Sequence, residues 1–198
     1  PHPSNKLIHV IPNGVDFDFF HPKEEEKKYD LLFAGNMNYP PNIQSVSFIV
    51  NEVLPLVKKA RSEIKFVIAG ANPSKEIMKL DLTNVEVTGW VDDIREYFYR
   101  SKIILAPMLI SIGLQNKILQ AMAMKTPCII STLANNAIGA EHNKEAMIAD
   151  SPEVIASTIL LLLNDEEKRR ELAETAFHFV SEKYDWKSFF PIGNDPSA

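Results

Sequence analysis

The segment most informative about the fold is Ile64-Lys65-Phe66-Val67-Ile68-Ala69, which Gly70 follows directly. A short apolar run rich in β-branched and aromatic residues, closed by glycine, is typical of a strand buried on both faces of a parallel sheet. Runs of the same kind recur along the chain. They are Asp30 to Ala34, Asn84 to Thr88, Lys102 to Ala106, Pro127 to Ser131 and Glu145 to Ala149. The sequence therefore predicts about six strands.

Helical patterns separate these runs. Between Asn42 and Ala60, apolar residues recur every three or four positions and make one stripe along a helix, in which Pro55 predicts a kink or an early end. Further helices are expected after Pro73, from Asp93 to Arg100 and from about Leu114 to Met124. Because each parallel strand needs a crossover connection, this alternation predicts an α/β fold with a Rossmann-like, doubly wound parallel sheet.

After Asp150 the pattern becomes purely helical. Helices are expected over Pro152 to Leu163 and Asp165 to Lys183, followed by a short turn from Tyr184 to Phe190. These C-terminal helices are expected to close one flank of the sheet.

The first residues have the composition of a linker. Prolines and the turn dipeptide Asn13-Gly14 interrupt short apolar patches there. We therefore predict an interdomain linker over residues 1–22, which stays outside the core and can be deleted at little cost in stability. Residues 23–190 are predicted to form one domain and residues 191–198 a tail.

Composition narrows the class of protein. The chain has 198 residues, 45% of them hydrophobic, which suffices for one core. Its net charge is -5 with both signs interspersed, so no basic face is expected and nucleic acid is excluded as a partner. The single cysteine, Cys128, fits a reducing compartment and predicts a cytoplasmic location. No apolar run reaches the roughly 20 residues that span a bilayer.

Ligands of open parallel sheets bind at the carboxyl ends of the strands, where helix N-termini attract anions. Three of the predicted strands are followed at once by glycine: Gly35, Gly70 and Gly89. Each glycine has two interpretations, close approach of a ligand or the steric demand of a tight turn. The dinucleotide fingerprint and the P-loop motif are both absent from the sequence.

Three segments carry a resemblance to a known family. They are Val10-Ile11-Pro12-Asn13-Gly14-Val15-Asp16, Val87-Thr88-Gly89-Trp90-Val91-Asp92-Asp93-Ile94 and Ser111-Ile112-Gly113-Leu114-Gln115-Asn116-Lys117-Ile118-Leu119-Gln120-Ala121-Met122-Ala123-Met124-Lys125-Thr126-Pro127. In order and spacing they resemble the C-terminal domain of the retaining "group 1" glycosyltransferases of the GT-B fold. The signature helix of that family reads leucine-glutamate-alanine-methionine-alanine before a glycine, a variable residue and a proline.

The resemblance implies the nucleotide-sugar-binding half of a two-domain enzyme. An acceptor-binding N-terminal domain is expected to precede it, so the chain is expected to be a fragment and to be inactive alone. The full enzyme would transfer a hexose-like sugar, with retention, from a nucleotide diphosphate sugar to an acceptor hydroxyl in polysaccharide or glycan biosynthesis. The resemblance implies no metal and no cofactor besides the donor. Peripheral membrane association of the full enzyme is a further expectation.

The resemblance also implies site residues. The family's ribose-binding glutamate corresponds to Gln120, and an upstream glutamate that contacts the donor sugar corresponds to Ile112. Both are departures, although members with a Gln-Asn-Lys triplet before the helix often lack the upstream acid. The donor-binding residues expected here are Gly35, Asn36, Gly89, Trp90, Val91, Gly113, Asn116 and Gln120.

Lys117 is the predicted catalytic residue. In the first turn of its helix, its charge and the helix dipole could together hold a diphosphate. The alternative is an exposed lysine that lies over apolar neighbours. Asn116 and Gln120 are four residues apart and share a helical face, whereas Ile118, Leu119, Met122 and Ala123 are expected in the core.

Other polar motifs receive structural interpretations. Asp16-Phe17-Asp18 mimics a metal-binding motif of another glycosyltransferase fold, but no metal site is predicted in the linker. Asp93 and Glu96 fit a capping box at the start of a helix. Cys128 is expected to be buried.

Two alternatives to a transferase domain stay open at this point. Ile112 and Gln120 suggest a degenerate, non-catalytic module with the same fold that serves protein association. A response-regulator-like or flavin-binding α/β domain would instead need an acidic cluster at the first strand end or a flavin phosphate loop, and the sequence has neither.

Overall fold

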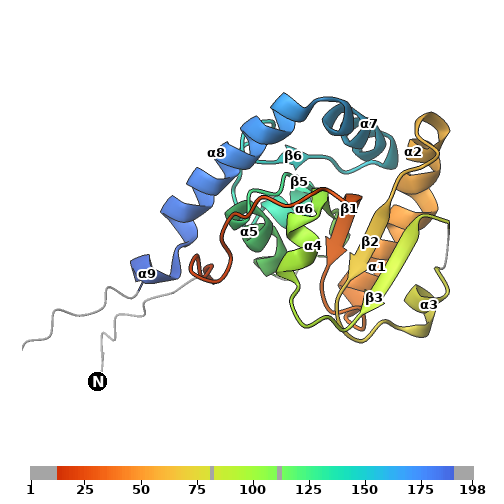
Figure 1. Cartoon of the computed structure of the whole chain (residues 1–198), viewed down its shortest axis with the longest axis horizontal. Coiled ribbons are helices and arrows are strands. Elements are labelled where there is room, and N and C mark those ends of the chain that lie inside the picture. The colour runs from red at the N-terminus through yellow and green to blue at the C-terminus, as the bar shows by residue number, and fades with distance from the viewer. Residues whose placement is uncertain (1–12, 81–82, 111–112, 190–198) are drawn as a thin grey trace, which may run out of the picture.

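The computed structural model describes residues 13–80, 83–110 and 113–189. Within them lies a six-stranded sheet in the order β3-β2-β1-β4-β5-β6, in which all neighbouring strands are parallel (Figure 1). The strands are β1 (Tyr29–Ala34), β2 (Phe66–Ala69), β3 (Val85–Gly89), β4 (Ser101–Ala106), β5 (Cys128–Ile130) and β6 (Met147–Ile148). The predicted α/β, doubly wound, Rossmann-like fold is confirmed, and each predicted strand overlaps an observed one.

Helices cover both faces of this sheet. They are α1 (Pro40–Phe48), the π-helical η1 (Ile49–Val53), α2 (Leu54–Ala60), α3 (Lys75–Met78), α4 (Arg95–Tyr99), α5 (Asn116–Ala123), α6 (Thr132–Asn135), α7 (Pro152–Asn164), α8 (Glu166–Tyr184) and α9 (Trp186–Phe189). Alternate residues of β1 point to opposite layers. Leu31 and Phe33 join a core with α1, η1, α2 and α7, whereas Leu32 and Ala34 join a core with α4, α5 and α8. The strands are therefore buried on both faces, as their apolar runs predict.

The predicted helix from Asn42 to Ala60 is interrupted without ending. It starts earlier, at Pro40, and passes through η1 before continuing as α2. Proline has no backbone N–H to donate, and Pro55 lies two residues past the end of η1, at the second position of α2. The Leu54 N–H reaches back to the Ile49 carbonyl, a wider turn than in an α-helix. The predicted irregularity at Pro55 is thus a π segment.

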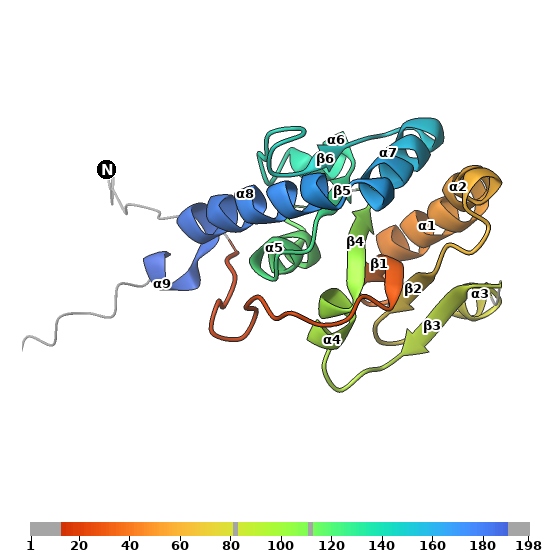
Figure 2. The same ribbon diagram turned by 45° about the horizontal axis from the view of Figure 1, so that its top comes forward.

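The N-terminal segment contradicts the prediction that residues 1–22 stay outside the core. Val15 is only 3% exposed and belongs to the core that contains α5 and α8. Its N–H donates to the Tyr184 carbonyl at 2.8 Å, and its carbonyl accepts from Trp186 at 3.2 Å. Phe17 and Phe20 pack against the same core. The described part of this segment thus packs as an element of the domain, running from α9 past α4 to β1 (Figure 2).

The structure describes only part of the two terminal segments. Residues 1–12 and the predicted tail, 191–198, lie outside the described residues. Among the helices that the structure describes, none combines the length and the apolar composition needed to cross a bilayer.

Replacing Val15 with alanine is expected to lower the free energy of unfolding by about 1–3 kcal/mol, because it leaves a void in a packed core. Glu24→Ala, which alters an exposed side chain nearby, is the matched control and should change it by less than about 0.5 kcal/mol. Urea denaturation measures both variants. Equal midpoints would show that the segment contributes nothing to the core.

Candidate functional site

A cavity of about 610 Å³ opens at the carboxyl ends of the first three strands. Its lining comes from the loops after β1, β2 and β3 and from the N-terminal turns of α5. The crossover from β1 leads to β2 on one side, while β4 lies on the other side of β1. Such a reversal of strand order leaves a crevice between the diverging connections, which is where ligands bind in open α/β sheets. The fold and this crevice define a Rossmann-like domain with a candidate ligand site.

The cavity brings together most of the residues predicted from sequence. Those that line it are Gly35, Asn36, Trp90, Val91, Asn116, Lys117 and Gln120. Gly89 and Gly113 do not line the cavity but directly precede lining segments that start at Trp90 and Leu114. Ile112 lies outside the described residues.

Two glycines form the floor where β1 and β2 end. The Gly35 N–H donates to the Ala69 carbonyl at 3.0 Å. A Cβ atom placed on Gly70 would lie 1.8 Å from the Gly35 carbonyl oxygen, well inside van der Waals contact. Gly70 is therefore required by the close approach of two backbones. Of the two interpretations of Gly70, the structure supports the steric one, and the same loop also lines the cavity.

The N-terminus of α5 faces the cavity without a side-chain cap. Gln115 occupies the N-cap position but makes no capping hydrogen bond, and no acidic residue lies in the first turn. The first backbone N–H groups of a helix carry a partial positive charge that favours anions. Ile118, Leu119, Met122 and Ala123 are buried as predicted, so the polar face of α5 is the one turned to the cavity.

Lys117 is held at the junction between α5 and β1. Its Nζ lies 2.6 Å from the Oδ1 of Asn42 and 4.1 Å from the centroid of the Phe33 ring. Burial lowers the pKa of Lys117 to about 7, because desolvation disfavours the charged form. Lys117 is therefore not the fully exposed lysine of the alternative interpretation, but its ammonium does lie over an apolar neighbour, the Phe33 ring. Its contact with Asn42 has no signal in the local sequence pattern.

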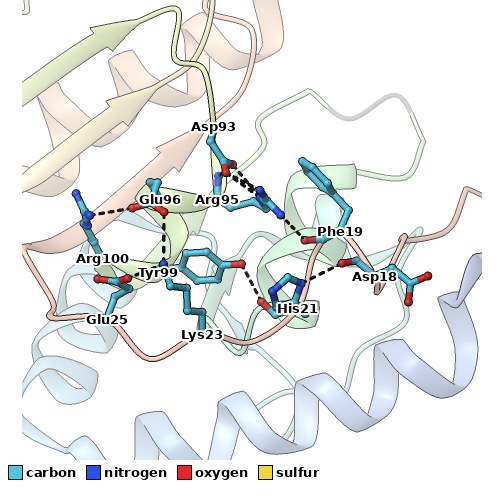
Figure 3. Close-up of polar contacts among 10 residues, drawn as sticks. All are labelled: Asp18, Phe19, His21, Lys23, Glu25, Asp93, Arg95, Glu96, Tyr99 and Arg100. Atoms are coloured by element: carbon cyan, nitrogen blue, oxygen red, sulfur yellow. Dashed lines mark hydrogen bonds and ion pairs between the residues drawn. The ribbon is translucent and has the colours of Figure 1, made fainter.

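The opposite rim of the cavity is aromatic. Trp90 is 76% exposed and Phe19 is 45% exposed, and both line the cavity. Arg95 is hydrogen-bonded to Phe19 (Figure 3): the Arg95 Nη1 donates to the Phe19 carbonyl at 3.0 Å. The guanidinium carbon also lies 3.9 Å from the Phe19 ring centroid, a cation–π contact. Sequence reasoning missed Phe19, because it lies in the segment interpreted as a linker.

Asp93 and Glu96 do not form the predicted capping box. The Asp93 carboxylate accepts the Arg95 N–H at 2.9 Å and pairs with the Arg95 guanidinium at 2.6 Å. This pairing lowers the pKa of Asp93. Glu96 instead pairs with Arg100 at 2.8 Å, so it does not reach back along the chain (Figure 3). The prediction is wrong because arginine partners compete successfully for both carboxylates.

The remaining polar candidates have structural partners. Asp16 Oδ1 accepts the backbone N–H groups of Asp18 and Phe19, and Asp18 pairs with Lys187 at 2.8 Å. Among the described residues, no three His, Cys, Asp or Glu side chains gather in a way that could hold a metal ion. Cys128 is buried as predicted, and burial raises the pKa of its thiol.

Comparison with known proteins assigns the family. A model of the family "Glycosyl transferases group 1" matches residues 28–165, and the chain belongs to this family. It is 26% identical over 181 residues to an uncharacterized 44.6 kDa protein in the cps region of Klebsiella pneumoniae, covering 87% of this chain and 47% of that protein. It is 25% identical over 158 residues to a Campylobacter jejuni α-1,4-N-acetyl-D-galactosaminyltransferase that is named for an undecaprenol-linked acceptor. That match covers 76% of this chain and 43% of the relative, so the chain spans about half the length of these curated relatives.

Solved structures support the fold assignment. The C-terminal domain of the group 1 glycosyltransferase LpcC from Francisella tularensis superposes with a TM-score of 0.70 at 21% identity. The superposition covers 87% of this chain and all of that domain. Anabaena HepE in complex with UDP-glucose superposes with a TM-score of 0.73 at 14% identity, covering 89% of this chain and 53% of HepE. The chain therefore has the fold of one half of a GT-B glycosyltransferase, and the half that it matches in LpcC is the C-terminal one.

Substitution of Gly70 by alanine is expected to cost more than about 3 kcal/mol of stability or to prevent folding, because its Cβ meets backbone. Gly89→Ala is the matched control. Gly89 also has a positive φ, of 69°, but a Cβ there meets nothing within 4 Å, so only backbone strain of about 1–2 kcal/mol is expected. Thermal melting compares the two, and equal stabilities would contradict the steric requirement.

Proposed function

We propose that this chain is the donor-binding domain of a glycosyltransferase that transfers a sugar from a nucleotide diphosphate sugar to an acceptor hydroxyl. The observation that carries the proposal is Lys117, a half-buried cation at the uncapped N-terminus of α5, in the crevice beside β1. A cation and a helix N-terminus that converge on one cavity suit an anionic diphosphate. The family assignment and the HepE complex with UDP-glucose support the same ligand class.

Each site residue predicted from the sequence has a proposed role. Lys117 and the first turn of α5 bind the diphosphate, and Gln120 and Asn116 bind the ribose hydroxyls. Gly89, Trp90 and Val91 contact the base. The backbone of Gly35, Asn36 and Gly113 approaches the donor closely.

The proposed chemistry is electrostatic. When the bond between the sugar and the diphosphate breaks, negative charge develops on the departing phosphate. Lys117 and the α5 N–H groups are already oriented toward that charge, so little reorganisation is needed at the moment of reaction. We propose that Lys117 supplies this stabilisation without a metal ion or other cofactor, and that a hexose-like sugar is transferred with retained configuration.

The acceptor side of the site is proposed to belong to a separate N-terminal domain. The coverage of about half of each curated relative is consistent with such a domain. We therefore expect no sugar transfer by these 198 residues alone. Polysaccharide or glycan biosynthesis, a cytoplasmic location and peripheral membrane association of the full enzyme belong to the same proposal, and the cps-region relative supports the first of these.

Gln120 motivates a second candidate function. An amide in place of the family's carboxylate makes a weaker acceptor for ribose hydroxyls. A non-catalytic module that serves protein association would tolerate this change. Nucleotide-sugar binding distinguishes the two candidates, because the module requires none.

The affinity of the chain for UDP-glucose is expected to depend on pH. Below about pH 7 Lys117 is charged and the affinity should be constant, whereas above it the affinity should fall by up to about tenfold per pH unit. The sign follows from the lowered pKa, since only the ammonium attracts the diphosphate. A sugar diphosphate ester does not itself titrate in this range, so calorimetry between pH 6 and pH 9 reports the protein.

Lys117→Met should weaken binding at pH 6 by about tenfold or more and abolish the pH dependence, because a charge-assisted contact is lost. Lys75→Met, which removes an exposed lysine from α3, is the matched control and should behave as the unmodified chain. A pH-independent affinity of the unmodified chain would contradict the role of Lys117, and complete absence of binding would favour the module.

Exchange of Gln120 tests the ribose contact. Glutamate should tighten nucleotide binding by roughly 1 kcal/mol, since a charged acceptor replaces a neutral one, and leucine should weaken it by a similar or larger amount. Stability should change little, because Gln120 lines the cavity. Calorimetry with uridine and guanosine diphosphates, beside melting curves, measures both effects. Unchanged binding by the leucine variant, or unfolding of either variant, would make Gln120 a packing residue.

A further inference from the structure

Asn42 is a buried polar residue that the sequence analysis does not single out. It lies in the first turn of α1 and is only 5% exposed. Its side-chain amide makes two contacts with opposite requirements. Nδ2 donates to the Asn36 carbonyl at 2.9 Å, and Oδ1 lies 2.6 Å from the Lys117 ammonium. Because a carbonyl can only accept and an ammonium can only donate, the two partners fix the orientation of the amide.

Gly35 leaves the space in which this contact forms. A Cβ atom on Gly35 would lie 2.8 Å from Asn42 Nδ2 and 3.2 Å from Lys117 Nζ. The amide and the ammonium therefore pack directly against the backbone at the end of β1. Asn42 belongs to α1 and Lys117 to α5, so this contact joins two helices through residues 75 positions apart in sequence.

Lys117 differs from several other lysines of the domain because its hydrogen-bond partner, the Asn42 amide, carries no charge. Lys102, Lys125 and Lys187 each lie within 2.8 Å of a carboxylate oxygen. Such a pair cancels most of the charge that an incoming anion would experience. An amide oxygen orients an ammonium through a hydrogen bond but leaves its net charge in place.

We propose that Asn42 is a positioning residue, whose amide aims the Lys117 ammonium into the cavity without neutralising it, so that the charge is available to a phosphate group. This inference rests on the proposed function of Lys117 as the diphosphate-binding cation. It explains why an amide suits this position better than a carboxylate. An aspartate would place one oxygen against the Asn36 carbonyl oxygen, where the two would repel, and its charge would cancel that of Lys117.

The hydrogen bond also favours the charged form of Lys117, in opposition to the desolvation that lowers the pKa of its amine. The titratable groups that line the same cavity are Tyr39, Asp92 and Asp93, the last of which is paired with Arg95. Desolvation alone accounts for the lowered pKa of Lys117. Because the amide oxygen stabilises the ammonium, removing the amide should lower the pKa of Lys117 further, and a carboxylate in its place should raise this pKa.

The test compares Asn42→Ala and Asn42→Asp with the control Asn51→Ala, an exposed asparagine of η1. One measurement is the pH titration of Lys117, followed by the NMR chemical shift of its Cε atom in isotopically labelled chain and assigned with Lys117→Met. The second is the affinity for UDP-glucose across the same pH range. Melting curves establish that each variant is folded.

For Asn42→Ala we expect a titration midpoint below that of the unmodified chain and an affinity about tenfold weaker near pH 7.5, recovering as the pH is lowered. For Asn42→Asp we expect a higher midpoint but weaker binding at every pH. Asn51→Ala should match the unmodified chain. A purely structural role of Asn42 would reduce stability or affinity without moving the midpoint.

An unchanged Lys117 midpoint in folded Asn42→Ala would overturn the inference, even if nucleotide binding is weaker. Failure of the proposed function looks different. In that case the unmodified chain would bind no UDP-glucose, while the titration midpoints could still shift as expected. If Asn42→Asp does not fold, Asn42→Ala alone decides the outcome.

Discussion

The structure depends on the burial of β1 between two layers and two neighbouring strands. All six residues of this strand are buried, and it pairs with β2 on one side and β4 on the other. Alternate side chains supply the centre of both cores, so neither layer of helices can pack without it. The same position makes β1 the strand at which the sheet order reverses. The crevice of the candidate site therefore follows from the constraint that builds the fold.

Most of the fold could be predicted because its strands satisfy a local rule. A strand covered on both faces must be apolar throughout, and runs such as Asp30 to Ala34 show this without reference to the rest of the chain. The N-terminal segment follows no such rule. Acidic residues separate its apolar residues: Val15 is buried, and Phe17 and Phe20 pack against the core. Val15 is bonded to Tyr184 of α8 and Trp186 of α9, and Phe17 contacts Phe177 of α8. Tertiary contact decides their burial.

Some residues of the candidate site could likewise be predicted from the sequence, and others could not. Residues that lie on loops after predicted strands, such as Gly35 and Trp90, could be placed at the cavity from topology alone. The contact of Lys117 with Asn42 could not, because it joins two helices through side chains far apart in sequence. The capping box was wrong for a related reason, since Arg95 and Arg100 offered the two acids stronger partners than the helix N-terminus. Charged partners decide such polar contacts, and local spacing does not identify them.

The floor of the cavity, formed by Gly35 and Gly70, tolerates amino-acid substitution less well than the aromatic rim. At Gly70 any side chain would collide with the backbone of Gly35, so this position of the floor accepts only glycine. The opposite wall is bounded by Trp90, most of whose surface is free of neighbours and whose exchange disturbs no core. The shape of the cavity can therefore be altered by substitution at the aromatic rim, whereas substitution at Gly70 is blocked by the backbone of Gly35.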